Sequence, residues 1–324
     1  MSHSFRAIPL NDHVYWVGAI DWELTDFHGY STDRGSTYNA YLILADKITL
    51  MDTVKDKYFD EMMARIYSVL HPERIDYIVS NHSELDHTGS LPKAVEEIKP
   101  NKIFASKKGE ETLKLHFHSD LPITAVGMHL ATMERFDDEV DRWILEYETK
   151  TYFANILWPF APSVRKIMGK VLSLDPPVRM IAPDHGPVWR KGVKYILDLY
   201  SRWLEAEQEN KAVIVFDTMW GSTGTMARII GEGLSSRGMT VKLLPLSRTP
   251  RSVVATELLD ASTLVVGSPN LNGGLFPTVA DILTYLKGLK PKSHPLKGAV
   301  FGSYGWAPAA VKQMAGYLEE MKVE

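Results

Sequence analysis

Four side chains that can bind a metal ion lie within six residues of this chain, namely His82, Glu84, Asp86 and His87. Two imidazoles and two carboxylates suit iron, manganese or zinc. They directly follow the apolar run 75–80, which is typical of a buried strand. Because such a strand would deliver these side chains to one loop, we interpret the loop as a metal site rather than as a solvated polar turn.

A second cluster of small and hydroxyl-bearing residues occupies positions 218–225, which read Thr-Met-Trp-Gly-Ser-Thr-Gly-Thr. It separates the apolar strand predicted at 213–216 from the helix predicted at 225–236. Unpaired backbone N–H groups at the start of a helix favour a phosphate group. The loop has no lysine and no Gly-x-Gly-x-x-Gly pattern, which argues against a nucleotide-hydrolysing loop and a dinucleotide fingerprint. A turn that merely caps the helix is the alternative.

Two later strands of the same region also end in small, polar or aromatic residues, at 268–273 and 302–306. Ligands of doubly wound sheets bind outside the carboxyl ends of the strands, so we expect the three loops to meet. One phosphate site beside flat aromatic side chains indicates FMN, although Trp and Tyr more often serve packing. The residues predicted to bind it are Thr218, Met219, Trp220, Gly221, Ser222, Thr223, Pro269, Asn270, Asn272, Gly273, Ser303, Tyr304, Gly305 and Trp306.

The elements around the two sites differ in kind, which predicts one domain at 1–208 and another at 209–324. The first opens with strands and continues with strands and helices, predicted at 14–17, 39–44, 48–52, 59–70, 75–80, 91–98, 103–105, 180–183 and 191–207. Residues 140–173 are predicted to be helical with interruptions at Pro159 and Pro162. The second alternates strands with helices, which predicts a parallel sheet covered on both faces.

Composition excludes several classes of protein. The net charge of −4 and the absence of Lys/Arg-rich runs argue against nucleic acid and membrane-surface binding. No signal-peptide pattern opens the chain and no apolar stretch reaches 18 residues, so a soluble cytoplasmic protein is expected. The chain has no cysteine, which excludes disulfides, iron–sulfur clusters and thiolate zinc sites.

The two sites in this order resemble those of the flavodiiron proteins, also called A-type flavoproteins. The resemblance covers nearly the whole chain and includes the stretches 16–22, 27–29, 37–41, 82–89, 154–156, 183–186, 219–220, 267–269 and 301–306. It implies a two-domain α/β protein: a metallo-β-lactamase-like αββα sandwich followed by a flavodoxin-like doubly wound parallel sheet.

The resemblance also implies a site of two iron ions. His82 and Glu84 would bind one iron, Asp86 the other, and His185 would be the last histidine ligand. His87 is not a ligand in every member, and His28 would lie near the iron pocket. Zinc hydrolases of the lactamase fold carry His at position 84, so the harder ligand Glu84 favours iron and redox chemistry.

The implied reaction is reduction of dioxygen to water or of nitric oxide to nitrous oxide, with electrons passed through FMN to the irons. The sequence leaves the choice of substrate open. The resemblance further implies a separate electron donor, such as rubredoxin or a reduced deazaflavin, and a homodimer or a dimer of dimers. Two alternatives remain: an FMN electron carrier whose metal domain is inactive, and a metal-dependent hydrolase of the lactamase fold.

The chain departs from this family in two places. The family's bridging Asp, and a His in a Leu-His-Trp-Pro-Asp context, have no match between residue 89 and residue 185. The residues that flank the missing segment meet near 126–128. None of the nearby histidines, His116, His118 and His129, stands in the Leu-His-Trp-Pro-Asp context of the family. The second domain shows four strands where five are expected. We therefore expect further residues in both places; a genuine internal deletion would leave a weakened or single-metal site that retains FMN.

Overall fold

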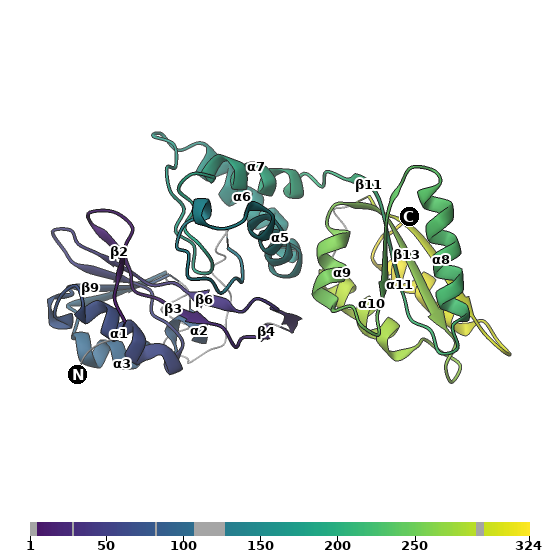
Figure 1. Cartoon of the computed structure of the whole chain (residues 1–324), viewed down its shortest axis with the longest axis horizontal. Helices are drawn as coiled ribbons and strands as arrows, with labels where there is room; N and C mark the ends of the chain where they lie inside the picture. Colours follow the sequence, from purple (N-terminus) through teal and green to yellow (C-terminus); the bar gives the residue numbers. More distant parts are fainter. Residues whose placement is uncertain (1–4, 28, 82, 107–126, 290–294) are drawn as a thin grey trace. The chain divides into compact units, whose positions relative to one another are not determined.

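The computed structural model describes residues 5–27, 29–81, 83–106, 127–289 and 295–324. His28, His82, His116 and His118 therefore lie outside the described residues. Contacts within the chain divide it into two compact units (Figure 1). The first comprises Met1–Thr25, Thr32–Glu148 and Arg179–Gly192, and the second comprises Asp26–Ser31, Thr149–Val178 and Val193–Glu324.

A mixed sheet of six strands forms the frame of the first unit (Figure 1). Its order is β1 (Ile8–Pro9), β2 (Val14–Trp16), β7 (Tyr41–Ile43), β8 (Thr49–Met51), β9 (Tyr77–Ser80) and β10 (Lys102–Ala105). β8, β9 and β10 run parallel, whereas the earlier strands pair antiparallel. β9 is an interior strand of this sheet, and its carboxyl end leads directly to the predicted metal loop.

Apolar side chains cover both faces of this sheet. One face packs against α1 (Phe59–Tyr67) and α3 (Leu91–Ile98), whose buried residues recur at helical spacing. The other face carries Trp16 and Tyr41 against Phe136 and Val188. Residues 180–183, predicted to be a short strand, form only a single bridge from Ile181 to Trp189.

Two short strands run beside the metal loop. β3 (Ala19–Asp21) and β6 (Ser36–Tyr38) pair antiparallel, and all six residues are buried. β6 therefore carries polar side chains into the interior of the unit. A second short pair, β4 (Asp26–Phe27) and β5 (Tyr30–Ser31), belongs to the second unit.

A largely buried carboxylate gives the first unit a pH-dependent stability. Burial raises the pKa of Glu148 from 4.5 to about 7, although Arg34 lies 2.9 Å away and partly offsets this effect. The protonated form therefore favours folding, so its contribution is full below the unfolded pKa and is lost as the pH rises through about 7.

Replacing Glu148 by glutamine is expected to remove this dependence. Relative to the variant, the wild-type protein should lose about 2–3 kcal/mol of unfolding free energy between low and neutral pH. Urea unfolding followed across this pH range measures the difference. Glu146→Gln, at an exposed position of the same helix, is the matched control and should leave the wild-type profile unchanged. A Glu148→Gln profile parallel to that of the wild type would contradict the assignment.

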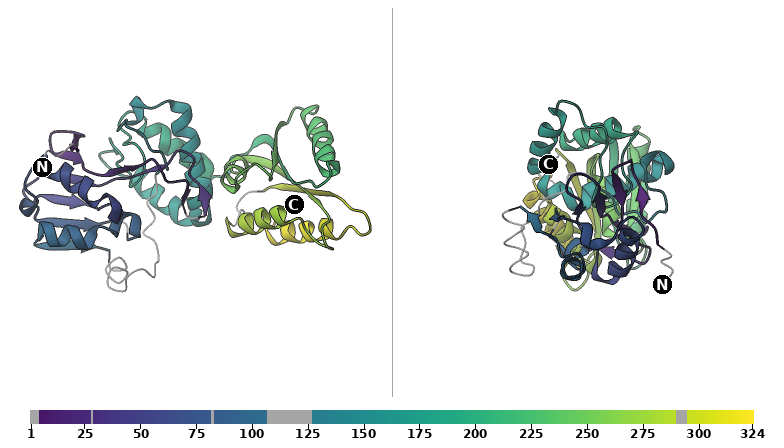
Figure 2. Two further views of the ribbon diagram at one scale, coloured as in Figure 1. Left: turned by 60° about the horizontal axis from the view of Figure 1, so that its bottom comes forward. Right: turned by 90° about the vertical axis from the view of Figure 1, so that its left-hand side faces the viewer.

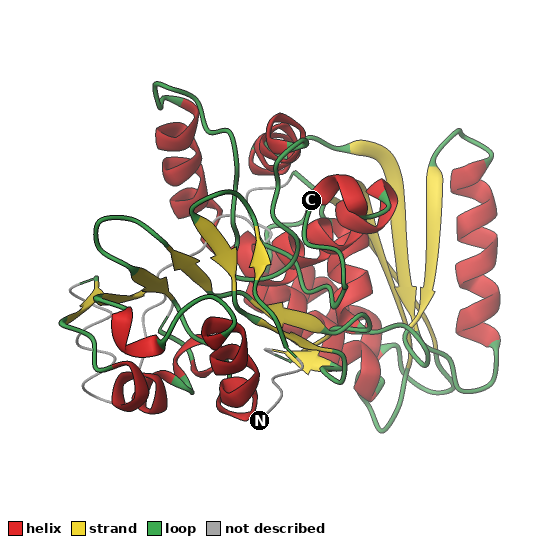
Figure 3. Cartoon of the chain, turned by 60° about the vertical axis from the view of Figure 1, so that its left-hand side comes forward, coloured by secondary structure: helices red, strands yellow, loops and turns green. Residues whose placement is uncertain are grey.

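A parallel sheet of four strands forms the frame of the second unit, in the order β12 (Thr240–Pro245), β11 (Glu209–Phe216), β13 (Ala261–Pro269) and β14 (Lys297–Ser303). α8 (Ser222–Ser235) covers one face. The other face packs against α9 (Arg251–Leu258), α10 (Pro277–Leu289) and α11 (Ala309–Glu320), and Figures 2 and 3 show helices on both sides of these strands. This is the alternation and the strand order expected for a doubly wound fold.

The helical stretch after Asp141 has the predicted extent and is interrupted near Pro159 as predicted, whereas Pro162 does not interrupt a helix. α5 (Arg142–Tyr152) continues through a π-helical turn, η4 (Phe153–Leu157), and a 3₁₀ turn, η5 (Trp158–Phe160), to α6 (Ala161–Leu172). Pro159 lies in the 3₁₀ turn and Pro162 in the first turn of α6, where a missing N–H is tolerated. α7 (Val193–Leu204) then leads to β11. Among the described residues, no helix combines the length and apolar character needed to span a bilayer.

Candidate functional site

Part of the predicted metal loop forms a short helix instead of an irregular loop. α2 (Leu85–Thr88) starts after Glu84, whose carbonyl accepts hydrogen bonds from the backbone N–H groups of His87 (3.0 Å) and Thr88 (2.8 Å). The Thr88 hydroxyl donates to the same carbonyl at 2.9 Å. This turn fixes the directions of two predicted ligands, Asp86 and His87.

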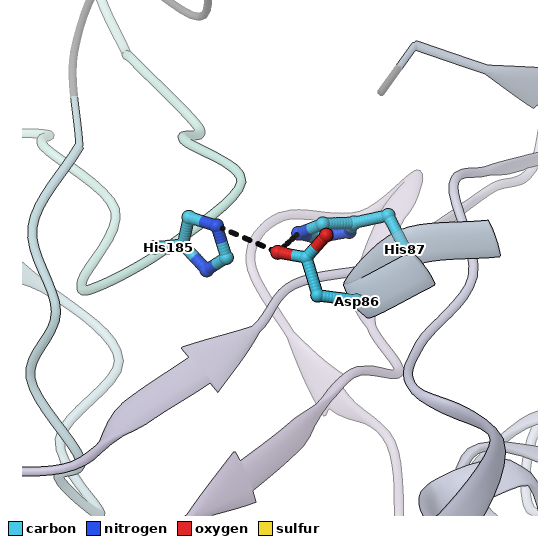
Figure 4. Close-up of side chains that lie close together, drawn as sticks. All are labelled: Asp86, His87 and His185. Atoms are coloured by element: carbon cyan, nitrogen blue, oxygen red, sulfur yellow. Dashed lines mark ion pairs between the residues drawn. The ribbon is translucent and has the colours of Figure 1, made fainter. Parts of the chain in front are cut away.

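Three buried side chains converge at this point. Asp86, His87 and His185 are at most 4% exposed, and one ligand atom from each lies within 4.8 Å of the others. The Asp86 Oδ2 atom lies 3.2 Å from Nε2 of His185 and 3.9 Å from Nε2 of His87. Figure 4 shows the carboxylate between the two imidazoles. Two imidazoles and one carboxylate in a buried pocket form a donor set that fits a divalent transition metal.

The His185 ring is held in the orientation that a metal ligand requires. Its Nδ1 atom lies 2.6 Å from the carbonyl oxygen of Thr37. Because a carbonyl only accepts hydrogen bonds, Nδ1 carries the proton and Nε2 presents its lone pair toward Asp86. Backbone carbonyls commonly orient metal-binding histidines in this way.

Two side chains that follow β6 in the sequence, Asn39 and Tyr41, anchor the loop that carries His185. The amide of Asn39 donates to the carbonyls of Pro183 and Gly186, both at 2.8 Å, and the Tyr41 hydroxyl donates to Pro183 at 2.7 Å. Gly186 has a φ of +85°, and a Cβ atom there would lie 2.5 Å from the Met128 side chain. Glycine is therefore required where the chain turns away from the site.

His129 belongs to the same buried cluster and was not predicted from the sequence. It is 3% exposed, its ring centroid lies 4.7 Å from that of His185, and its Nδ1 atom lies 2.7 Å from the Ser36 hydroxyl. Ser36 also approaches Nδ1 of His185 at 3.5 Å. No local motif marks His129, since its partners lie on a strand far away in the sequence.

The remaining predicted metal residues have different outcomes. Glu84 lies at the start of α2 and is partly buried, but it is not one of the three described residues whose ligand atoms group together. His82 and His28 fall outside the described residues. The structure therefore assembles Asp86, His87 and His185, and the ligand roles of Glu84 and His82 stay predictions.

The three predicted cofactor loops follow β11, β13 and β14 and meet at the carboxyl edge of the parallel sheet. The hydroxyls of Thr223 and Ser303 lie 2.8 Å apart, and the Asn270 N–H donates to the Ser303 carbonyl at 2.8 Å. Gly221, with φ +87°, precedes the first turn of α8. That helix begins at Ser222, so Ser222 and Thr223 lie at its N-terminus, where a phosphate is favoured.

Large aromatic side chains stand exposed at the same edge. Trp220 is 91% exposed, Trp306 100% and Tyr304 57%. Such exposure is unusual for aromatic side chains that only pack a core. Asn272 and Gly273 both have positive φ values, and a Cβ atom on Gly221 or Gly305 would meet nothing within 4 Å. Helix-terminal hydroxyls, open glycines and exposed rings together fit the phosphate and flat ring of FMN.

Two family models match separate parts of the chain. The ODP family beta-lactamase model matches residues 37–140, which contain α2 and His129. The flavodoxin model matches residues 214–324, which contain the three cofactor loops. The two matches lie on either side of residues 208 and 209, although the domain boundary predicted there stays a prediction.

Full-length comparisons agree with this pairing of domains. A nitric oxide reductase of Moorella thermoacetica is 36% identical over 365 aligned positions that cover 98% of this chain and 91% of that protein. The structure of rubredoxin oxygen:oxidoreductase from Desulfovibrio gigas superposes with a TM-score of 0.93 at 35% identity, covering 98% of this chain and 91% of that one. The flavodiiron protein from Giardia intestinalis gives 0.91 at 28% identity, with coverages of 98% and 88%.

The alignment with the Moorella relative is longer than this chain. It spans 365 positions, whereas the chain has 324 residues, so at least 41 aligned positions have no residue here. These positions lie within the alignment. That a segment of the family pattern is missing near residues 126–128 stays a prediction.

Proposed function

Because this chain belongs to the flavodiiron protein family, we propose that it is an oxidoreductase that reduces dioxygen to water, nitric oxide to nitrous oxide, or both. The observation that carries this proposal is the buried group of Asp86, His87 and His185 in a chain that also contains a flavodoxin domain. A metal pair held by this group would supply redox-active cations that can bind and polarise a diatomic substrate.

Within this function, Asp86, His87 and His185 would hold the metal ions, and we assign His82 and Glu84 to complete the set. Asp86 supplies an anionic oxygen between the two imidazoles, and Thr37 fixes the ring of His185. Burial of all three side chains excludes bulk water from the reacting atoms, which strengthens every electrostatic interaction in the site.

The carboxyl edge of the parallel sheet would hold FMN, which would supply the electron-transfer chemistry between a redox partner and the metal ions. Ser222 and Thr223 at the N-terminus of α8 would bind its phosphate, and Trp220, Tyr304 and Trp306 would flank its ring. We assign the donor to the rubredoxin class, a role supported by the name of the Desulfovibrio relative, with a reduced deazaflavin as the alternative donor. A homodimer and a cytoplasmic location are further parts of this proposal.

The shorter chain supports one second candidate function. If the missing positions of the alignment are a genuine deletion, a bridging carboxylate and one histidine ligand are lost with them. Such a protein would keep FMN and serve as an electron carrier with a weakened metal site. The buried ligand group favours the reductase.

Rapid mixing of the reduced protein with substrate tests the proposed function. Protein loaded with iron and reduced without oxygen is mixed with dioxygen or nitric oxide while flavin absorbance is followed. We expect reoxidation that is faster than in iron-free protein and that yields water or nitrous oxide. Equal rates with and without iron would reject the reductase and leave the electron carrier.

A single hydroxyl tests the phosphate site. Replacing Ser222 by alanine is expected to weaken FMN binding roughly tenfold or more, because a hydrogen bond to a charged group contributes about 1.5–3 kcal/mol. Fluorescence quenching during FMN titration measures the dissociation constant. Ser235→Ala, at the opposite end of the same helix, is the control and should bind FMN as the wild type does. Equal affinities for the wild type and Ser222→Ala would place the phosphate elsewhere.

A further inference from the structure

A buried carboxylate outside the metal group gathers several polar side chains around it. Asp21, at the end of β3, is 1% exposed. Its Oδ2 atom accepts a hydrogen bond from the Tyr38 hydroxyl at 2.7 Å, and its Oδ1 atom lies 3.2 Å from Nζ of Lys57. Nζ of Lys55 lies 3.8 Å from Oδ2. Tyr58 also faces this carboxylate and lowers its pKa, so four titratable side chains surround one buried acid.

The outer side of this cluster opens to a cavity. Lys57 and Tyr58 line a hollow of about 700 Å³ whose wall also contains Ile20, Trp22 and Met133. Lys57 is half-exposed. Water in this hollow therefore reaches the ammonium group that contacts Asp21.

The inner side of the cluster contacts the metal-binding imidazoles. The Tyr38 ring is fully buried and lies edge-on to His87 and His185, with centroid distances of 6.2 and 6.0 Å. Nζ of Lys55 lies 4.7 Å from the centroid of the same ring. Figure 1 shows β3 and β6, which carry Asp21 and Tyr38, near α2. The cluster therefore extends from the cavity to the buried metal ligands.

The proposed reaction requires such a connection. Reduction of one dioxygen to two waters consumes four protons with four electrons, and reduction of two nitric oxides to nitrous oxide and water consumes two of each. The electrons come from the redox partner, whereas the protons must come from water. Since the metal ligands are buried, water in the hollow needs a path of polar groups to supply them.

We propose that Asp21, with Lys57 on its outer side and Lys55 on its inner side, carries protons from the cavity to the metal centre. This inference rests on the proposed function. Lys55 releases a proton toward the substrate and regains one from cavity water through Asp21 and Lys57, so that only N–H and O–H bonds change. Tyr38 holds the carboxylate in place.

The electrostatics of the two inner groups agree with this role. Burial lowers the pKa of Lys55, and the attraction of Asp21 and Asp86 only partly restores it, against the repulsion of Lys57. A lysine of lowered pKa releases its proton more readily. Burial raises the pKa of Asp21, but hydrogen bonds from Tyr38, Tyr58 and Lys57 outweigh burial and keep the pKa below its ordinary value. The Asp21 carboxylate is therefore ionised at neutral pH and holds a transferred proton only briefly before passing it on.

The test compares Asp21→Asn with Asp56→Asn in the iron-loaded, FMN-bound protein. Asp56 lies in the same neighbourhood, is exposed, and pairs with Lys93 at 2.8 Å, so its replacement makes the same change of charge. Both variants should bind wild-type amounts of iron and FMN. Asp21→Asn should be reoxidised by substrate at least about tenfold more slowly at high pH, with a smaller loss as the pH falls. Its solvent deuterium isotope effect should exceed that of the wild type.

Each result has a distinct meaning. An unchanged rate, or a slower rate with an unchanged isotope effect and pH profile, would overturn the proton path. A wild-type protein that reacts no faster than its iron-free form would instead reject the proposed function. If Asp21→Asn does not fold, Lys57→Met takes its place. The half-exposed Lys57 should show the same pH-dependent loss, and a wild-type profile in that variant would also overturn the proposal.

Discussion

Asp86→Ala is expected to lose its metal and, with it, the reduction of dioxygen or nitric oxide. Asp86 supplies the one carboxylate of the buried group, and both imidazoles lie within 4 Å of it. Loss of residues that merely orient ligands weakens metal binding 10- to 100-fold, so loss of the ligand itself should lower affinity and rate by at least about 100-fold. Iron content after gel filtration and the rate of flavin reoxidation measure the two effects.

FMN content separates this result from misfolding. The flavodoxin domain binds FMN through residues that Asp86 does not contact, so the variant should remain yellow with the wild-type flavin content. Asp198→Ala is the matched control, because Asp198 is 57% exposed and pairs with Lys194 on the surface of α7. That variant should keep full iron and full rate. An Asp86→Ala protein that retained two irons and the wild-type rate would show that the metal lies elsewhere.

The local part of the metal site could be predicted from the sequence, whereas its distant part could not. Asp86 and His87 stand in one motif after a strand, and that motif survives in the structure as α2. Only the family resemblance predicts that His185 is a ligand. His129 was missed because its partner Ser36 lies 93 residues away, and no spacing rule describes contacts that a fold creates between separate loops.

In the second unit, the pattern of apolar residues predicts the strands and helices but not where they begin. The apolar run predicted a strand at 213–216, whereas β11 spans Glu209–Phe216. Its first residues are polar, but their backbone pairs with β12 and β13 all the same. The helix predicted at 225–236 begins at Ser222, because hydroxyl-bearing residues that indicate a loop also suit the first turn of a helix.

The polar start of β11 includes Lys211, which no apolar pattern would place in a core. Its side chain is only 4% exposed and contacts the carboxylates of Asp260 and Glu257, the latter at 3.3 Å. Asp260 also pairs with Lys150 of α5. Four charged side chains therefore meet in the second unit, with Lys211 buried and the other three largely buried. Each depends on its partners, since an uncompensated charge in the interior is very costly.

Asp260→Ala should consequently destabilise the second unit by about 3–5 kcal/mol, because it removes the carboxylate that the buried Lys211 and the largely buried Lys150 both contact. Urea unfolding measures this loss. Asp281→Ala is the control: it breaks an exposed pair with Arg251 at 3.2 Å, which should contribute less than about 1 kcal/mol. Adding Lys150→Met to Asp260→Ala should restore part of the lost stability. Equal losses in the two single variants would refute the argument.

The pH dependence of that loss follows from the ionisation of Asp260. Burial raises its pKa, but attraction and hydrogen bonds from Lys150 and Lys211 outweigh burial and hold the pKa below 3.8. The ionised form therefore stabilises the folded state at every pH above the unfolded value, and this stabilisation is lost as the pH falls through the folded pKa. The gap between wild type and Asp260→Ala should stay constant from neutral pH down to about pH 5 and narrow below pH 4. A gap that narrowed near neutral pH would contradict this ionisation of Asp260.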